Sequence, residues 1–398
     1  MGLDRHPAAG ASRLERIDTG LLAPFVEEAV GHRGLWITKW DHALVKGEWT
    51  SSGRLVCRFS GTAADETDEV PWSLYLKIPN PADTNYCPWH REPIQREVLL
   101  FRSRLLEDLP GQIAAPRLLG ITEYAGEEPW MWIEDVGGES AFEWPVERFG
   151  VTARQFGRMQ GEFLAGRPLP DEPWLETSGW LAIQLAGAAA PMAETTERIR
   201  RHALTENLWR SEFDERVQTV WARREALFDA MERAPKSLCH GDFVYGNLFD
   251  RAGPDGGSET AIIDWQYCGI RQIGGDIAGL IADCSVMAPR RKAAEPEEFL
   301  SVVLDGYLSG LRESGWRGDT DLARFAALAR LGLVCFCWAL PSLDAEAVGR
   351  RVGPGNRGEI EEALDQGARR VRFLLKQAEE AAVLLDRLGP PAYDSEKP

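Results

Sequence analysis

The sequence has little of what disulfide-bonded, zinc-binding and membrane-spanning proteins need. Its seven cysteines are an odd number and none lies in a CxxC pair, which argues against a disulfide framework and a zinc site. The most apolar long segment, Phe325 to Leu340, contains Arg330 and is too short to cross a bilayer, so it predicts a buried helix. No apolar run near the N-terminus resembles a secretory signal. We therefore expect a cytoplasmic protein.

The sequence also has fewer basic than acidic residues. The 398-residue chain has 45 lysines and arginines against 62 aspartates and glutamates, a formal net charge of −17. Such a charge repels nucleic acid phosphates and anionic lipids, so we expect neither nucleic acid nor a membrane as partner. Hydrophobic residues make up 44% and charged residues 27%, as in folded globular proteins. The length predicts two domains, or one domain with two lobes.

The first third of the sequence predicts antiparallel strands and one helix. Segment 35–79 shows short alternating apolar and polar runs separated by turns, with the clearest alternation in 72–78. Apolar residues in 93–109 recur at helical spacing. A further apolar strand, 130–133, precedes the glycine pair 137–138, which predicts a connection between two lobes.

The remaining sequence predicts helices interrupted by one hairpin. Two short apolar runs, 248–250 and 261–263, flank the turn residues Gly-Pro-Asp-Gly-Gly at 253–257. Helices are expected at about 151–165, 180–203, 206–232, 276–287, 295–314, 319–341 and 358–388.

The segment His-Gly-Asp-Phe-Val-Tyr-Gly-Asn at 240–247 carries the most specific chemical signal. Asp242 precedes Asn247 by five positions, the spacing of a kinase catalytic loop. An aspartate there can accept the proton of a substrate hydroxyl, and an asparagine can offer a neutral oxygen to Mg²⁺. The spacing alone recurs by chance in long chains.

Asp264 strengthens this interpretation. It ends the second strand of the predicted hairpin, whose first strand begins at Asn247. The start of one hairpin strand and the end of the next lie at the same open end, so Asn247 and Asp264 should converge. Together they predict a metal clamp for nucleotide phosphates. Two turn-capping residues at a hairpin base are the alternative interpretation.

A lysine and a glutamate in the first lobe form a third candidate group. Glu97 shares a predicted helical face with Ile94 and Phe101. A carboxylate buried there without a partner costs on the order of several kcal/mol. Lys77, on the strand face opposite the apolar one, is the expected partner, and a lysine so held can bind nucleotide phosphates. A surface glutamate at the rim of the helix is the alternative.

Taken together, these motifs resemble the aminoglycoside phosphotransferase and choline kinase superfamily over about 36–290. The resemblance rests on HGDFVYGN at 240–247, IIDW at 262–265 and the segment 269–276, with support from LYLKIP at 74–79, REVLLF at 96–101 and IEDVGG at 133–138.

The resemblance implies a role for each residue of the second lobe. Asp242 would be the catalytic base, and Asn247 and Asp264 the magnesium ligands. His240 and Asp276 would stabilise the loop and take no part in the reaction.

It also implies that Lys77 and Glu97 anchor the phosphates and that backbone groups of Glu134 to Val136 bind adenine. A GxGxxG loop is absent between the first strands, where the sequence has only GEWTSSG at 47–53. Backbone amides and the hydroxyls of Ser51 and Ser52 could cover the phosphates there. An ordinary hairpin turn is the alternative.

We therefore expect an α+β, two-lobed, protein-kinase-like fold. Residues 1–133 would form a small nucleotide-binding lobe of antiparallel strands with one helix, and 134–398 a large helical lobe with the catalytic hairpin and substrate pocket. The expected function is Mg²⁺-dependent transfer of the γ-phosphoryl group of ATP, or of GTP, to a hydroxyl of a small molecule, such as an aminoglycoside-like antibiotic or an amino alcohol.

Two other functions remain open. An atypical protein kinase is disfavoured because Trp265 and Gln266 follow Asp264 where protein kinases have Phe-Gly, and no Ala-Pro-Glu segment follows. A nucleotide-binding pseudokinase would usually lack the base or a metal ligand, and both are present.

The acidic composition suggests a positively charged acceptor. Surplus carboxylates, with Asp283 as a candidate, would line the acceptor side. A solvated acidic surface that keeps the protein soluble is the alternative.

Overall fold

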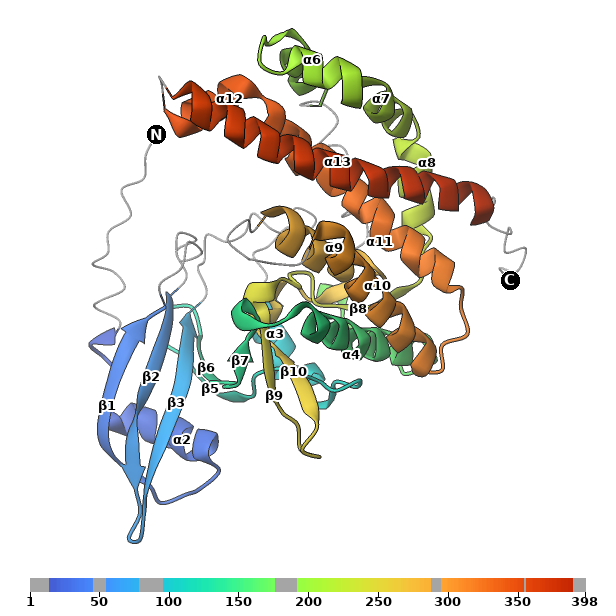
Figure 1. The fold of residues 1–398 in the computed structure, drawn as a ribbon. Coiled ribbons are helices and arrows are strands. Elements are labelled where there is room, and N and C mark those ends of the chain that lie inside the picture. The colour runs from blue at the N-terminus through green and yellow to red at the C-terminus, as the bar shows by residue number, and fades with distance from the viewer. Residues whose placement is uncertain are drawn as a thin grey trace. The chain divides into compact units, whose positions relative to one another are not determined.

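The computed structural model describes residues 14–45, 55–78, 96–175, 192–287, 295–353 and 356–388. The chain divides into two compact units, coloured mainly blue and green to red in Figure 1. The first unit comprises Met1–Asp108 and Ala114–Gly138, and the second comprises Leu109–Ile113 and Glu139–Pro398.

A five-stranded antiparallel sheet forms the first unit, in the order β1-β2-β3-β6-β5. Its strands are β1 (Trp36–Leu44), β2 (Leu55–Ala64), β3 (Glu69–Ile78), β5 (Leu118–Thr122) and β6 (Trp130–Glu134). The alternation predicted for 72–78 is confirmed, because Trp72, Leu74 and Leu76 on β3 are buried in one core. Antiparallel strands in this part of the chain were expected, and β5 was not.

Two described helices belong to this unit, not the single one expected. Helix α2 (Thr19–Val30) packs against β3 and β5, and its Phe25 stacks on Trp132 of β6 with ring centroids 4.8 Å apart. Leu22 and Val26 are fully buried. Pro24 inside the helix obscured its periodicity in the sequence.

The helix expected over 93–109 is shorter. Helix α3 (Arg96–Arg102) is followed by a 3₁₀ turn, Leu105–Asp108. Arg104 between them has a φ of 61°, a left-handed value that an α-helix cannot contain. Positions 93–95, and with them Ile94, lie outside the described residues.

The second unit holds the predicted hairpin, which is confirmed. Strands β9 (Leu248–Ala252) and β10 (Ser258–Ile262) pair antiparallel, and the two-residue strands β4 (Ile113–Ala114) and β7 (Glu139–Ser140) flank them. A second pair, β8 (Lys236–Cys239) with β11 (Gly269–Gln272), was not predicted. Its short strands show no alternation that sequence could reveal.

Helices make up most of the second unit, as expected, and the α+β fold class is confirmed. They are α4 (Val146–Leu164), α6 (Glu206–Leu208), α7 (Asp214–Ala222), α8 (Arg224–Glu232), α9 (Gly275–Ala282), α10 (Pro296–Glu313), α11 (Thr320–Val334), α12 (Ala345–Val352) and α13 (Arg357–Leu388), with a further helical run at 192–201. Short 3₁₀ turns occur at Ala141–Glu143, Pro173–Leu175, Tyr245–Asn247, Trp265–Tyr267 and Leu340–Leu343, and π-helical turns at Trp209–Phe213, Asp283–Met287 and Cys335–Ala339. The sequence did not predict α12.

Helices α4 and α10 lie side by side and touch backbone to backbone (Figure 1). Glycines line the contact, among them Gly150, Gly157, Gly306 and Gly310. A Cβ on Gly157 would lie 2.3 Å from the carbonyl oxygen of Tyr307, and one on Gly310 would lie 2.0 Å from that of Arg154. Only glycine permits this approach.

None of the helices in the described ranges combines the length and apolarity needed to cross a bilayer. Five cysteines are described, and all are buried free thiols: Cys57, Cys239, Cys268, Cys284 and Cys335.

Candidate active site

The segment predicted as a catalytic loop, 240–247, leaves strand β8 and leads into β9 through the 3₁₀ turn Tyr245–Asn247. Gly241 in this segment has a φ of 85°. A Cβ there would lie 2.4 Å from the carbonyl oxygen of Tyr267. Both the left-handed conformation and the close approach require glycine, so the bend of the loop is tightly specified.

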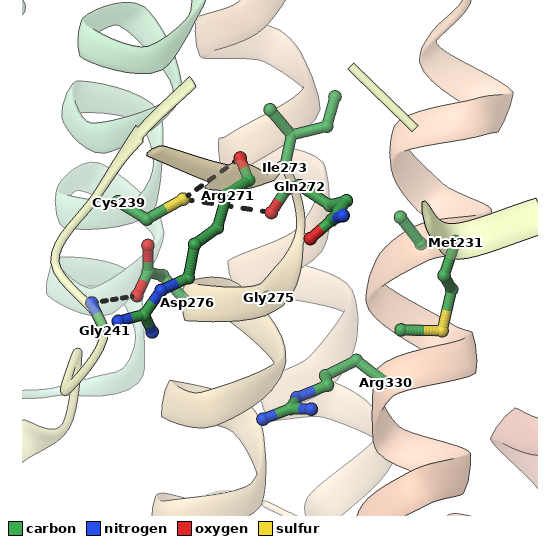
Figure 2. Close-up of a pocket in the computed structure, with 10 residues that line it drawn as sticks. Met231, Cys239, Gly241, Arg271, Gln272, Ile273, Gly275, Asp276 and Arg330 are labelled. Atoms are coloured by element: carbon green, nitrogen blue, oxygen red, sulfur yellow. Dashed lines mark hydrogen bonds between the residues drawn. The ribbon is translucent and has the colours of Figure 1, made fainter. Parts of the chain in front are cut away.

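The carboxylate of Asp276, in the first turn of α9, fixes this bend through two hydrogen bonds. Its Oδ1 accepts a hydrogen bond from the Gly241 amide at 2.7 Å, and its Oδ2 accepts one from the His240 amide at 3.2 Å. Figure 2 shows the first of these bonds, with Cys239 and Arg271 beside it. The side chain of Asp276 is buried. Charge-assisted bonds to two successive amides fix the backbone just before Asp242.

His240 is fully buried and neutral. Its Nδ1 accepts from the backbone amide of Asp242 at 3.2 Å, and its Nε2 lies 3.0 Å from the carbonyl oxygen of Ile263. An amide can only donate, so the proton sits on Nε2 and is donated to Ile263. Burial lowers the pKa of His240, which favours this neutral form. His240 therefore links the loop to the end of the hairpin.

Asp242 carries a carboxyl group made more basic by its surroundings. Burial is the largest cause of its raised pKa, and the negative charges of Asp264 and Asp276 raise the pKa further. A hydrogen bond from Asn247 opposes this rise. The Asn247 amide nitrogen donates to the Asp242 carbonyl oxygen at 2.9 Å and to its Oδ2 at 3.1 Å. A carboxylate with a raised pKa and a fixed orientation suits acceptance of a proton.

The hairpin brings Asn247 and Asp264 to the same end. The backbone amide of Ile263 donates to the carbonyl oxygen of Asn247 at 3.0 Å, continuing the β9–β10 ladder by one step. Asp264 follows immediately and has a left-handed backbone, with φ 64° and ψ 55°. This conformation is unusual outside glycine and is typical of functional sites. The predicted convergence of the two residues is therefore confirmed.

The chemistry of these two side chains fits a magnesium ion. Because the Asn247 amide nitrogen is bound to Asp242, a cation would be held by its Oδ1, and Asp264 would add a carboxylate. Within the described ranges, no group of three or more His, Cys, Asp or Glu side chains could hold a metal by itself. Mg²⁺ bound to phosphates needs only one or two carboxylates from the protein.

Asp283, the candidate acid of the acceptor side, contacts the same loop. The residue starts the π-helical turn that follows α9. Its Oδ2 accepts from the backbone amide of Tyr245 at 3.2 Å. Burial, with a smaller contribution from the charge of Asp242, raises the pKa of Asp283 to about 6, against the lowering effect of the Tyr245 bond. One carboxyl with a raised pKa, Asp242, thus lies in the loop and another, Asp283, lies against it.

The first unit contains the predicted lysine and glutamate pair. The Nζ atom of Lys77 lies 2.8 Å from Oε1 and 2.7 Å from Oε2 of Glu97. Both residues are buried, at 6% and 8% exposure, so the pairing is confirmed and the alternative of a surface glutamate is wrong. The β3 face opposite the apolar one is also covered at this position. A buried ion pair of this kind is held in place because separating the two charges would leave each of them buried without a partner.

Comparison with known families places the chain. A family model described as the phosphotransferase enzyme family, APH, matches residues 56–318. The chain belongs to this family. The superfamily recognised from the sequence motifs is thereby confirmed, and the chain is a phosphotransferase of the APH family.

Several solved structures resemble the chain at low sequence identity. An ethanolamine kinase from Plasmodium vivax is 14% identical with a TM-score of 0.46, covering 94% of this chain and 95% of its own. A choline kinase from Cryptosporidium parvum is 13% identical with a TM-score of 0.45, covering 88% and 90%. An amicoumacin kinase solved with AMP-PNP and Ca²⁺ is 14% identical with a TM-score of 0.46, covering 93% and 96%. Comparison with curated protein sequences gave no match.

The remaining nucleotide-site residues expected for an APH phosphotransferase lie in or near the first unit. Glu134 ends β6, and its Oε2 accepts from the Arg117 amide at 2.9 Å, so its side chain is engaged within the sheet. Val136 is half-buried. Contact of this segment with adenine stays a prediction. Ser51 and Ser52 lie outside the described residues.

Sequence reasoning missed the contact between Asp283 and the loop. Asp283 lies 38 positions from Tyr245, and only the π-helical turn after α9 brings its carboxylate to that amide. In the structure, the π-helical turn that begins at Asp283 marks this residue as a candidate, because such turns occur frequently at functional sites.

Proposed function

We propose that this phosphotransferase moves the γ-phosphoryl group of ATP, or of GTP, to a hydroxyl group of a small molecule in a Mg²⁺-dependent reaction. The observation that carries the proposal is the convergence of Asp242, Asn247 and Asp264 at the open end of one hairpin. These three residues supply a basic carboxylate, a neutral amide oxygen and a second carboxylate. Phosphoryl transfer to an alcohol needs this set of groups.

Asp242 would orient the acceptor hydroxyl and accept its proton. Its raised pKa brings its basicity closer to that required at neutral pH, and the Asn247 amide fixes the direction of its Oδ2. Assistance of this kind contributes about 10²–10⁴ in rate. Asn247 and Asp264 would hold the Mg²⁺, which neutralises charge on the nucleotide phosphates when bound.

Lys77 would bind a phosphate oxygen of the nucleotide. Glu97 accepts both close contacts from its ammonium group and so fixes its position within the first unit. Because both side chains are buried, the lysine loses little further conformational entropy when it binds an anion. The adenine contact through Glu134 and Val136 belongs to the same proposal.

The acceptor would carry a positive charge near its reactive hydroxyl. Burial raises the pKa of both Asp242 and Asp283, and repulsion from a neighbouring acid raises each further, from Asp264 and Asp276 for Asp242 and from Asp242 for Asp283. A cationic group placed nearby would relieve that repulsion. Amino alcohols and aminoglycosides are the substrate classes with this chemistry. Inactivation of an antibiotic, and location in the cytoplasm, are parts of the proposal that follow from such a substrate and from the composition.

The test is a transfer assay with γ-labelled ATP and GTP. The panel would contain amino alcohols, aminoglycosides and, as matched controls, neutral alcohols and sugars without an amino group. We expect labelled product from at least one cationic acceptor, dependent on Mg²⁺ and absent with Asp242→Asn. A best acceptor that is neutral or anionic would contradict the proposed charge. Transfer to proteins and to none of the small molecules would favour an atypical protein kinase.

A further inference from the structure

A closed ring of buried hydrogen bonds surrounds the base of the catalytic loop. From it we infer that Gln160 and Tyr307 are positioning residues, which set the place of Asp242 without touching the reacting groups. The inference rests on the function proposed above. Neither residue lies in a motif of the sequence, and they come from different helices, α4 and α10.

Gln160 anchors the end of the strand that enters the loop. Its Nε2 donates to the carbonyl oxygen of Leu238 at 3.1 Å and lies 3.2 Å from Sγ of Cys239. The main-chain carbonyl oxygen of Gln160 accepts a hydrogen bond from the hydroxyl of Ser237 at 3.0 Å. Gln160 is 1% exposed, so its amide finds its partners within the protein. Strand β8 is therefore held along its last three residues.

Tyr307 joins this anchor to the start of α9. Its hydroxyl donates to Oε1 of Gln160 at 2.5 Å and accepts from the backbone amide of Gly274 at 3.3 Å. Burial raises the pKa of Tyr307 well above its ordinary range, so the hydroxyl keeps the proton that it donates. The glycine contact at Gly157 lets α10 approach α4 closely enough for this bond.

The ring closes through the loop itself. Two positions after Gly274, the carboxylate of Asp276 accepts from the amides of His240 and Gly241. The main chain from Leu238 to His240 completes the ring. The donors and acceptors run in one direction, from Gly274 to Tyr307, to Gln160 and to the Leu238 carbonyl oxygen.

This arrangement bears on catalysis because Asp242 follows the ring by one residue. The two sides of the loop base, β8 and the first turn of α9, cannot shift independently while the bonds at Gln160 and Tyr307 persist. A misplacement of about 1 Å at a catalytic group can cost on the order of 10²-fold in rate. Opening the ring should therefore lower kcat and leave nucleotide binding by the metal ligands and Lys77 little changed.

The first experiment compares Tyr307→Phe and Gln160→Met, which keep side-chain volume and remove the bonds. Each should lower kcat about 5- to 50-fold, with nucleotide KM within about threefold of wild type. The double variant should lose no more than the worse single variant, because either change opens the same ring. Thr205→Val is the matched control: its buried hydroxyl donates to the Ile199 carbonyl oxygen at 2.7 Å in another part of the unit.

A merely structural role would give a different pattern. If Thr205→Val lowered kcat as much, or if the losses of the two single variants multiplied in the double variant, the inference would be overturned. An unchanged kcat in Tyr307→Phe would overturn it as well. Should Gln160→Met fail to fold, Tyr307→Phe against Thr205→Val still decides.

Hydrogen exchange provides a readout that does not depend on turnover. With Tyr307→Phe we expect faster amide exchange in peptides covering 238–247, and with Thr205→Val faster exchange confined to peptides around 199–205. If the wild-type chain transferred no phosphoryl group, the proposed function would fail, and the exchange data would still test the ring. Unchanged exchange in 238–247 would show that Tyr307 does not hold the loop.

Discussion

Asn247 donates its side-chain amide to Asp242 twice, at 2.9 Å to the main-chain carbonyl oxygen and at 3.1 Å to Oδ2 of the carboxylate. One residue thus orients the candidate base through its amide nitrogen, and its side-chain oxygen is the atom proposed to bind the cation. The bond also lowers the pKa of Asp242, against the larger effect of burial. The position of the candidate base is therefore coupled to that of Asn247.

The coupling makes Asp242→Asn an informative variant. The new amide can still accept from Asn247 and so preserve the geometry, but it cannot accept a proton. We expect kcat to fall at least about 100-fold and nucleotide affinity to stay within about threefold. Calorimetry with a nucleotide and Mg²⁺ measures the second quantity. Asp255→Asn at the hairpin tip, where Asp255 bonds the Gly257 amide, is the matched control and should be fully active.

Metal dependence should separate Asp264 from Lys77. Asp264→Gly removes a proposed magnesium ligand, so nucleotide affinity should fall about tenfold or more in Mg²⁺ and be unchanged in EDTA. The variant Lys77→Met/Glu97→Gln removes a phosphate contact without leaving a buried charge, and should weaken binding in both conditions. Identical metal dependence of the two variants would show that at least one of these residues has another role.

The left-handed backbone of Asp264 predicts an inverted order of stability for two substitutions. With φ 64°, alanine there is strained and glycine is not, so Asp264→Ala should be less stable than Asp264→Gly by about 1–2 kcal/mol. Urea unfolding measures the difference. At Asp365, an exposed position within α13, the same pair should show the usual order, with alanine more stable by about 1 kcal/mol.

The buried pair in the first unit predicts a rescue. Lys77→Met leaves Glu97 buried without its partner, which should lower the free energy of unfolding by about 3–5 kcal/mol. Adding Glu97→Gln removes the stranded charge and should restore most of that loss. Denaturant unfolding of the two variants checks this. If the double variant were no more stable than Lys77→Met alone, the carboxylate would not be the source of the cost.

Removing the negative charge of Asp283 should stabilise the folded protein, by an amount that depends on pH. Its pKa is raised from 3.8 to about 6, so folding favours the protonated form. Its contribution to stability is full below pH 3.8 and is lost as the pH rises through about 6. Asp283→Asn should therefore be more stable than wild type at pH 7.5, by up to about 3 kcal/mol, and equal to it near pH 3.5.

A carboxyl with the opposite shift provides the control for this measurement. A hydrogen bond from Arg148 lowers the pKa of Asp250. Asp250→Asn should therefore be less stable than wild type at pH 7.5, with the difference disappearing as the pH falls through the lowered pKa. A stability difference for Asp283→Asn that does not vary with pH would contradict the raised pKa.

Features encoded in local patterns could be predicted from the sequence. The β9–β10 hairpin follows from two apolar runs around a turn, and the Asn247–Asp264 convergence follows from hairpin geometry. The Lys77–Glu97 pair follows from the cost of a carboxylate on a packing face.

Features that depend on contacts between distant segments could not be predicted. Gln160 and Tyr307 meet across 147 positions, and nothing in either helix marks them as partners. Strands β8 and β11 are too short to show alternation, and α2 is hidden by Pro24 and becomes a helix because its buried face packs on the sheet. In each case tertiary packing outweighs local preference.

The glycine contact between α4 and α10 has a consequence for how this protein can vary. A glycine within a helix can usually be replaced by alanine, which has the higher helix propensity. At Gly150, Gly157, Gly306 and Gly310, a single methyl group would instead overlap the neighbouring helix. A saturation mutational scan should therefore show a narrow strip of near-complete intolerance along this crossing, with alanine as poorly accepted as much larger residues. Homologous sequences should keep glycine at these four positions, while the solvent-facing positions of the same two helices vary.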